Sequence, residues 1–322
     1  MNQTLKGIGI WTAKIVVTVL FLAYILRTVP LPLVVQALRG ANISYVLLAL
    51  AALLVSRVLM GCRMKQITNH QGMSLTVPQL VGISLTSTFY GTFLPGSLGG
   101  GLIRWYRLSR QDRKPGAALA AIAFDRLLDT SASTVLGLVC WLLSVSGRSR
   151  LPVGMVLLAS FLVCAAVFWL AFHAKISVKK VKKLNSLLEA AQNYRTFPKR
   201  SLASVFSLSL AIQLTGTVSF AFAAQALDIQ LPFADFAWIR TFAILAAMLP
   251  ITVAGLGVRE GVALALMGPY GIDPAQIVAF SVVRLANSLV IAGLGGLVEL
   301  KEAFSPNRIH APSAVEYKAV VR

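Results

Sequence analysis

Charged side chains occur inside a long apolar run, at positions where a bilayer would make charge expensive. Asp125, Arg126 and Asp129 lie within the run 116–145. Asp125 is nine residues into that run (125 − 116 = 9), about 13 Å along a helix axis and near the middle of a hydrocarbon core about 30 Å thick. Asp125 and Asp129 share one helix face, and the spacing of Arg126 and Asp129 allows them to pair. Charge at this depth indicates a functional site, and the competing interpretation is a structural ion cluster that holds helices together.

A second apolar run, 273–298, carries Arg284 near its middle and Asn287 one turn further on. No acidic residue close in the sequence neutralises Arg284. We expect its partner to be a ligand anion or one of the acids Asp125, Asp129 and Glu260. A lipid phosphate is the ligand we favour, because a guanidinium group binds phosphate through two parallel hydrogen bonds.

Two proline- and glycine-rich stretches would break helices at membrane depth. In each, an arginine follows a Leu-Pro pair by nine positions after the proline (104 − 95 = 9; 259 − 250 = 9), and the two prolines are 155 residues apart (250 − 95 = 155). Such backbone is tolerated in a bilayer only where it is buried in protein or lines a cavity. Paired breaks in matching halves predict a transporter-type binding site. The predicted break residues are Pro95, Gly96, Gly99, Gly100, Pro250, Gly255 and Gly257.

Arg104 and Arg259 close these breaks, where free backbone N–H groups and the start of a helix favour an anion. Arg104 also has an ordinary explanation as a cytoplasmic flank, since further basic residues follow it. Arg259 and Glu260 lie in an apolar neighbourhood, so we expect them to be buried or to face a cavity. The predicted substrate-binding residues are Arg104, Asp125, Arg126, Asp129, Arg259, Glu260, Arg284 and Asn287.

The composition indicates that this chain lies in a lipid bilayer. Of 322 residues, 57% are hydrophobic and 13% are charged, against about 25% charged in a soluble domain. The mean hydropathy is +0.76. The net charge of +19 arises from bases gathered in short loops between apolar runs, which suits anionic headgroups better than nucleic acid. We therefore expect an all-α integral membrane protein.

The apolar runs predict six full spans and two broken elements. The spans are predicted at 8–26, 43–60, 116–145, 151–172, 201–227 and 273–298. The broken elements are predicted at 77–101 and 236–270.

Loop charges predict the orientation. Basic loops at 61–76, 104–114 and 175–200 belong in the cytoplasm, and the acid-leaning loop at 228–235 belongs outside. Each broken element must then enter and leave on one side, as a re-entrant hairpin or a pair of short spans. Both termini are cytoplasmic in this arrangement.

The two halves read alike in opposite orientations, which predicts a helical bundle with an inverted-topology repeat. Arg126-Leu127-Leu128-Asp129 and Arg284-Leu285-Ala286-Asn287 follow the two breaks at similar spacing (284 − 126 = 158). We expect one membrane domain over 1–300. Repeat one covers about 8–145 and repeat two about 151–298, and 301–322 form a cytoplasmic tail.

Catalytic signatures are missing from the sequence. It contains no GxSxG, Walker A or HExxH pattern, and its three cysteines and three histidines show no metal-ligand spacing. We expect no catalytic residue, no cofactor and no metal. Two alternatives stay open: a membrane transferase acting on polyprenyl-phosphate lipids, with Asp125 and Asp129 as an acid–base pair, and a scaffold for an envelope-lipid synthesis complex.

The two breaks carry a family resemblance. Leu94-Pro95-Gly96 through Gly99-Gly100 to Arg104 resembles the first signature of the lysylphosphatidylglycerol synthase transmembrane-region family, which is also called flippase-like. The stretch from Leu249-Pro250 through Gly255 to Arg259-Glu260-Gly261 resembles its more specific second signature. The first signature often has an acid shortly after the glycines, where this chain has Gly101-Leu102-Ile103. The resemblance covers nearly the whole chain and implies lipid movement between leaflets.

The expected form is a short one. After Val298 only 24 residues remain (322 − 298 = 24), fewer than the roughly 40 that the smallest self-sufficient domains need. We therefore expect no soluble aminoacyltransferase domain. The leading hypothesis is a bacterial inner-membrane translocase for a phosphate-containing lipid, phospho- or polyprenyl-linked. Its expected partners are a lipid with an anionic headgroup and a lipid-synthesis enzyme, with no nucleic acid, and the oligomeric state is left open.

Overall fold

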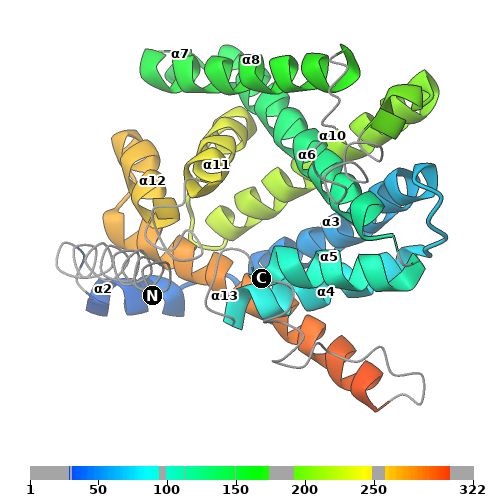
Figure 1. Cartoon of the computed structure of the whole chain (residues 1–322). Helices are drawn as coiled ribbons and strands as arrows, with labels where there is room; N and C mark the ends of the chain where they lie inside the picture. Colours follow the sequence, from blue (N-terminus) through cyan, green and yellow to red (C-terminus); the bar gives the residue numbers. More distant parts are fainter. Residues whose placement is uncertain are drawn as a thin grey trace, which may run out of the picture.

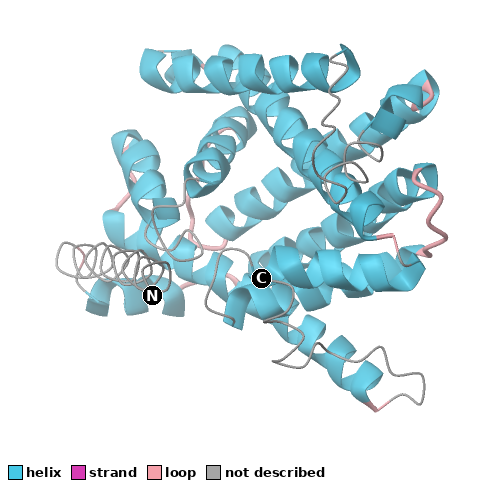
Figure 2. Ribbon diagram, viewed as in Figure 1, coloured by secondary structure: helices cyan, strands magenta, loops and turns pink. Residues whose placement is uncertain are grey.

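The architecture of the chain is all-helical in the part that the structure describes. A computed structural model describes residue 29 and residues 31–93, 99–112, 114–148, 150–173, 192–248 and 258–304. Within these ranges the chain forms helices joined by loops, with no strand (Figure 2). This confirms the predicted fold class of an all-α membrane bundle.

Five helices are long and apolar enough to cross a bilayer. They are α3 (Ile43–His70), α6 (Pro115–Leu143), α8 (Leu151–His173), α10 (Lys199–Gln225) and α13 (Pro274–Ala303). Each overlaps one of the predicted spans, and the predicted span 8–26 lies outside the described residues. The chain is therefore a multi-pass membrane protein.

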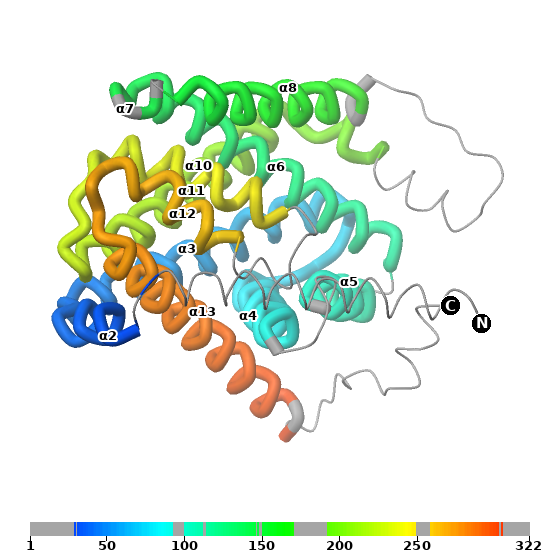
Figure 3. The backbone as a smooth tube through the Cα atoms, turned by 90° about the vertical axis from the view of Figure 1, so that its left-hand side faces the viewer, coloured from blue at the N-terminus to red at the C-terminus, as the bar shows by residue number. Residues whose placement is uncertain are grey.

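The exposed surface is that of a protein surrounded by lipid. α8 lies at the top of Figures 1 and 3 and exposes large apolar side chains on the outside of the bundle. Met155, Trp169 and Val163 of α8 are 70%, 62% and 61% exposed. Such exposure is costly in water and favourable in a bilayer.

Each predicted broken element consists of two helices. α4 (Val77–Phe93) and α5 (Gly99–Asp112) form the first hairpin, and α11 (Phe233–Met248) and α12 (Val258–Met267) form the second. The two helices of each hairpin pack against each other. The connections 94–98 and 249–257 lie outside the described residues, and with them Pro95, Gly96, Pro250, Gly255 and Gly257.

The first break is shorter than the sequence predicts, because Gly99 and Gly100 begin α5 instead of preceding it. Early helix positions cost glycine little, since their N–H groups have no intrahelical partner in any case. Gly100 also lets α5 approach α4 closely. A Cβ at this position would lie 2.7 Å from the Ser87 carbonyl oxygen and 3.2 Å from Gly91 Cα.

Short helices complete the described chain: α2 (Leu31–Arg39), α7 (Val145–Arg148), η1 (Tyr194–Thr196) and η2 (Gly268–Tyr270). Two of the long helices, α3 and α13, begin with a side-chain cap. The Asn42 side chain accepts from the Ser44 N–H at 3.0 Å before α3, and Asp273 accepts from the Ala275 N–H at 2.7 Å before α13.

α3 is ten residues longer than the predicted span (70 − 60 = 10). The sequence prediction placed 61–76 in a basic loop, and this is wrong for 61–70. The reason is a long-range contact, because the charge that appeared to end the span, Arg63, is buried and neutralised by carboxylates of α6. A charge with buried partners can continue a membrane helix.

α3 of the first half (31–143) and α10 of the second half (151–303) pack side by side at the centre of the bundle. A glycine on each central helix touches the first hairpin helix of its own half. Gly61 meets Val81 of α4, and Gly216 meets the Arg240 side chain of α11. A Cβ at either glycine would come closer than 3.0 Å to its neighbour. The two glycines are 155 residues apart (216 − 61 = 155).

A second glycine pair joins the halves to each other. α6 packs on α11, and α13 packs on α4. Gly137 of α6 meets the Thr241 side chain, and Gly295 of α13 meets the Leu85 backbone carbonyl, again closer than 3.0 Å for an added Cβ. These glycines are 158 residues apart (295 − 137 = 158). In each half, therefore, a glycine allows a long helix to pack closely against the first hairpin helix of the other half.

Candidate functional site

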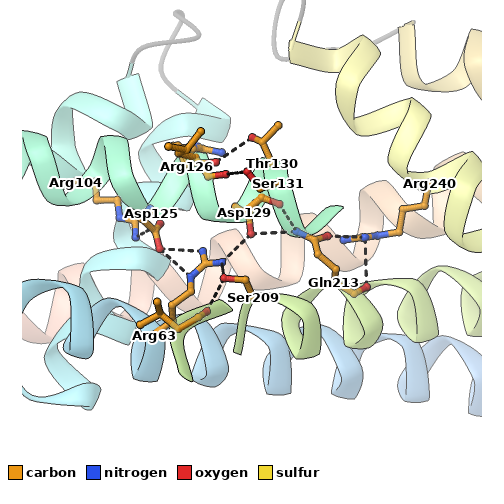
Figure 4. A network of polar contacts seen from close by, with 12 residues as sticks. Arg63, Arg104, Asp125, Arg126, Asp129, Thr130, Ser131, Ser209, Gln213 and Arg240 are labelled. Atoms are coloured by element: carbon orange, nitrogen blue, oxygen red, sulfur yellow. Dashed lines mark hydrogen bonds and ion pairs between the residues drawn. The ribbon is translucent and has the colours of Figure 1, made fainter. Parts of the chain in front are cut away.

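The central polar cluster is built around Arg63 of α3. Its Nε donates to Asp125 Oδ1 at 2.9 Å, and its Nη1 contacts Asp129 Oδ1 at 3.2 Å (Figure 4). Nη2 lies 2.9 Å from Asp125 Oδ1 but without hydrogen-bond geometry. Arg104 of α5 donates from Nη2 to the other oxygen of Asp125, Oδ2, at 3.0 Å. Two arginines from different helices therefore share one carboxylate.

Burial makes this pairing obligatory. The side chains of Arg63 and Asp125 are 0% and 2% exposed, and Arg104 is 12% exposed. The desolvation cost of a buried charge is offset only when an opposite charge and hydrogen bonds are in place. The spacing of Asp125 and Asp129 puts both carboxylates on the face of α6 that meets α3, as the sequence predicts.

The cluster extends into the second half of the chain. Gln213 of α10 donates from Nε2 to Asp129 Oδ1 at 3.1 Å, and its Oε1 accepts from Arg240 Nη1 of α11 at 2.9 Å. A continuous series of polar contacts therefore runs from α5 through α6, α3 and α10 to α11 (Figure 4). It joins a helix of the first hairpin to a helix of the second.

Arg126 does not enter this network through its side chain. It is exposed on α6, and its backbone carbonyl accepts from Thr130 Oγ1 at 2.9 Å. The sequence spacing allowed Arg126 to pair with Asp129, but in the structure Asp129 pairs with Arg63 and accepts a hydrogen bond from Gln213. Adjacent residues on a helix point in different directions, so Asp125 faces the bundle and Arg126 does not.

Arg284 of α13 lies against aromatic rings. Its guanidinium carbon is 4.7 Å from the ring centroid of Phe220 and 5.6 Å from that of Phe280. Among the described residues no carboxylate is within ion-pair distance of it. Its charged neighbours are Arg240, Arg259 and Glu260. Of the acids that the sequence offered as partners, the nearby one is therefore Glu260, and Asp125 and Asp129 belong to the other cluster.

The remaining predicted residues lie on α12 and α13. Arg259 and Glu260 begin α12, where Arg259 is exposed and Glu260 is half-buried. Asn287 is buried on α13, one turn after Arg284. The structure thus groups the predicted residues into two clusters. Arg104, Asp125 and Asp129 lie in one, and Arg259, Glu260 and Arg284 lie in the other.

Four residues that form these polar contacts were not predicted from the sequence: Arg63, Gln213, Arg240 and Arg107. Arg240 stands alone in an apolar stretch, so the depth argument used for Asp125 would have found it. Arg63 was hidden by its resemblance to a basic flank. Gln213 carried no signal, because an amide in a span is common enough to pass unnoticed.

Arg107 fastens the first hairpin to the end of α13. Its side chain is buried, and it pairs with Glu302 at 2.7 Å and, more closely still, with Glu299. The carboxylates are three residues apart on α13 and so face the same way. Glu299 and Glu302 follow Arg107 by 192 and 195 positions, and no sequence pattern indicates that they pair with it.

The arginine side chains of this arrangement have the chemistry to bind an anion. Guanidinium groups donate in a planar fork that matches phosphate and carboxylate oxygens. Within the described ranges, no group of three or more His, Cys, Asp or Glu side chains is placed to hold a metal. The described site therefore offers fixed positive charge in a largely apolar surrounding.

Comparison with known protein families identifies the family of this chain. A search among curated proteins finds no similar sequence. The family profile described as "Lysylphosphatidylglycerol synthase TM region" matches residues 11–296, a range that includes both hairpins and both clusters. The chain therefore belongs to the lysylphosphatidylglycerol synthase TM region family.

Proposed function

We propose that this protein moves a phosphate-containing lipid, phospho- or polyprenyl-linked, between the leaflets of the bacterial inner membrane. Membership in its family makes it a membrane protein of lipid handling. The observation that carries the finer proposal is the polar series from Arg104 to Arg240, which joins the two hairpins inside the bundle. A headgroup crossing a bilayer needs polar partners at a depth where lipid tails offer none.

We propose that the two halves form an inverted-topology repeat, which would suit this mechanism. The glycine pairs that mark the helix contacts recur at offsets of 155 and 158, and these are also the offsets of the two Leu-Pro breaks and of the two Arg-Leu motifs. The contacts themselves exchange between halves, since α6 meets α11 as α13 meets α4. In transporters built this way, one repeat moves against the other and the central site opens to each side in turn.

The proposed roles follow from the contacts. Arg104, Arg126, Arg259 and Arg284 would bind the headgroup phosphate as it passes. Asp125, Asp129 and Glu260 would hold arginines in place, as Asp125 holds Arg104 at 3.0 Å. Asn287, buried beside Arg284, would add a neutral donor.

The proposal also fixes an orientation. Both termini and the basic segment 104–114, most of which lies in α5, would be cytoplasmic, and the loop between α10 and α11 would face outside. A lipid-synthesis enzyme is the natural partner on the cytoplasmic side, because it would supply the lipid to be moved.

A leaflet-resolved assay tests the proposal. The purified protein is reconstituted into vesicles with labelled phosphatidylglycerol or labelled polyprenyl phosphate, and a membrane-impermeant quencher reports the label in the outer leaflet. We expect the protein to accelerate exchange, and Arg104→Gln to slow it about tenfold or more, because a charged hydrogen bond contributes about 1.5–3 kcal/mol. Arg200→Gln is the matched control, since Arg200 is exposed at the start of α10 and lies outside both clusters. Exchange equal to that of protein-free vesicles for both lipids would overturn the proposal.

A further inference from the structure

The two halves differ in charge at matching positions. The offset of 158 relates Arg126 to Arg284, and it also relates Asp125 to Val283 and Asp129 to Asn287 (283 − 125 = 158; 287 − 129 = 158). The second half therefore keeps the arginine and replaces both carboxylates with neutral side chains. The acids that neutralise the first cluster have no counterpart on α13.

Arg284 is held in a setting that favours an incoming anion. Phe220 and Phe280 lie against its guanidinium group at 4.7 and 5.6 Å and shield it from solvent. Ring faces attract a cation weakly and leave the edge of the guanidinium fork free of any described carboxylate. A planar cation held in this way is positioned to bind a phosphate through two N–H groups.

Arg240 of α11 has neutral hydrogen-bond partners on α10, the helix that also carries Phe220. Its Nη1 donates to Gln213 Oε1 at 2.9 Å and lies 3.4 Å from the Gln213 carbonyl oxygen. Its guanidinium group fits against Gly216, where any side chain would collide with it. Within the described part of the chain it forms no ion pair, so its full charge acts on its surroundings.

The sum of charges around Arg284 is positive. Among the described residues, the charges that act most on Arg284 are those of Arg240, Arg259 and Glu260, and Asp129 acts on Arg240. Asp129 already contacts Arg63 and Gln213, so the three arginines with Glu260 leave two positive charges in excess among these described groups. Gathering like charges in a partly buried place is costly, and an anion between them removes that cost.

We propose, on the basis of the proposed lipid transport, that Arg240, Arg259 and Arg284 form the phosphate site and select lipids whose headgroups carry net negative charge. The class comprises phosphate headgroups without a cation, such as phosphatidylglycerol or polyprenyl phosphate. Zwitterionic phosphatidylethanolamine and cationic lysyl-phosphatidylglycerol carry an ammonium group, which would face the three arginines and bind less well.

Binding tests this inference separately from transport. The purified protein in neutral detergent is titrated with each of the four lipids, and the shift in its unfolding temperature gives an affinity. We expect phosphatidylglycerol or polyprenyl phosphate to bind at least about tenfold more tightly than either ammonium-bearing lipid, because loss of one charge-assisted contact has about that effect. The comparison between the first two shows which phosphate lipid the site takes.

Variants identify the site. Arg284→Gln and Arg240→Gln should each weaken binding of the anionic lipid about tenfold or more and reduce the preference over phosphatidylethanolamine. Arg259→Gln serves where those variants unfold, because Arg259 is exposed and its replacement leaves the packing intact. Arg200→Gln removes the same charge from an exposed helix start and should change nothing.

The outcomes are distinct. Equal affinity for all four lipids, or tighter binding of an ammonium-bearing lipid, overturns the proposed selectivity even if the protein transports lipid. Unchanged affinity in the folded arginine variants overturns the site. Selective binding without any acceleration of exchange would support the site and overturn the transport function.

Discussion

Arg63 of α3 and Asp125 of α6 form a hydrogen-bonded ion pair of 2.9 Å in which the side chains are 0% and 2% exposed. The residues are 62 positions apart in the sequence. The pair joins two membrane helices at the point where Arg104 of the first hairpin also binds Asp125. A stabilising contact and the proposed lipid pathway therefore share one carboxylate.

Removal of one partner of this pair should destabilise the protein strongly. Arg63→Met leaves Asp125 with Arg104 alone, and we expect a loss of about 3–5 kcal/mol in the free energy of unfolding, as for other buried pairs. Denaturant unfolding in detergent micelles measures it. The double variant Arg63→Met/Asp125→Leu should lose less than the sum of the two single variants, because neither Arg63 nor Asp125 is then buried without the other, although Arg104 and Asp129 each lose a partner. Additive losses in the double variant would show that the two side chains are not coupled.

The glycine contacts between the halves predict a sharp difference between neighbours on α13. Gly295→Ala would press a methyl group against the Leu85 backbone carbonyl, and overpacking of this kind costs about 1–3 kcal/mol. Gly293→Ala is the matched control, because nothing lies within 4 Å of its added Cβ. It should be neutral or stabilising by at most about 1 kcal/mol from helix propensity. Thermal unfolding of both variants measures the difference, and similar behaviour would contradict the close approach of α13 and α4.

The proposed inverted topology predicts opposite labelling on the two sides of the membrane. Gln230 lies in the loop between α10 and α11, and Lys114 lies between α5 and α6; both are exposed. In a chain without Cys62, Cys140 and Cys164, an impermeant thiol reagent added to intact cells should label Gln230→Cys and not Lys114→Cys. Labelling of Lys114→Cys before lysis would contradict the orientation and, with it, the two re-entrant hairpins.

The sequence predicted much of this fold because apolar runs and loop charges are local signals. Two helices flank each of the stretches 94–98 and 249–257, where the predicted breaks lie outside the described residues. Asp125 and Asp129 share a face because helix geometry alone requires it. The predicted end of α3 was wrong. A rule based on local charge treats Arg63 as the end of a span, but Asp125, 62 positions away, neutralises it.

The candidate site was predicted less completely. Arg240 could have been found from its depth in an apolar run, whereas Arg107 could not, because its partners Glu299 and Glu302 are close only after folding. The aromatic surroundings of Arg284 could not be predicted from the sequence either, because they too form only after folding. Phe220 on α10 carries nothing in its sequence context that points to a guanidinium group on α13. Pairings between distant helices are a property of packing.

The measurement that tests the central claim most directly is the rate at which labelled phosphatidylglycerol changes leaflets in vesicles containing the purified wild-type protein. Protein-free vesicles and vesicles with an unrelated multi-pass protein provide the baselines. The account predicts exchange well above both baselines and a return toward them in Arg284→Gln, with Arg200→Gln as fast as wild type. Exchange at the baseline in the wild type, or undiminished exchange in Arg284→Gln, would contradict it.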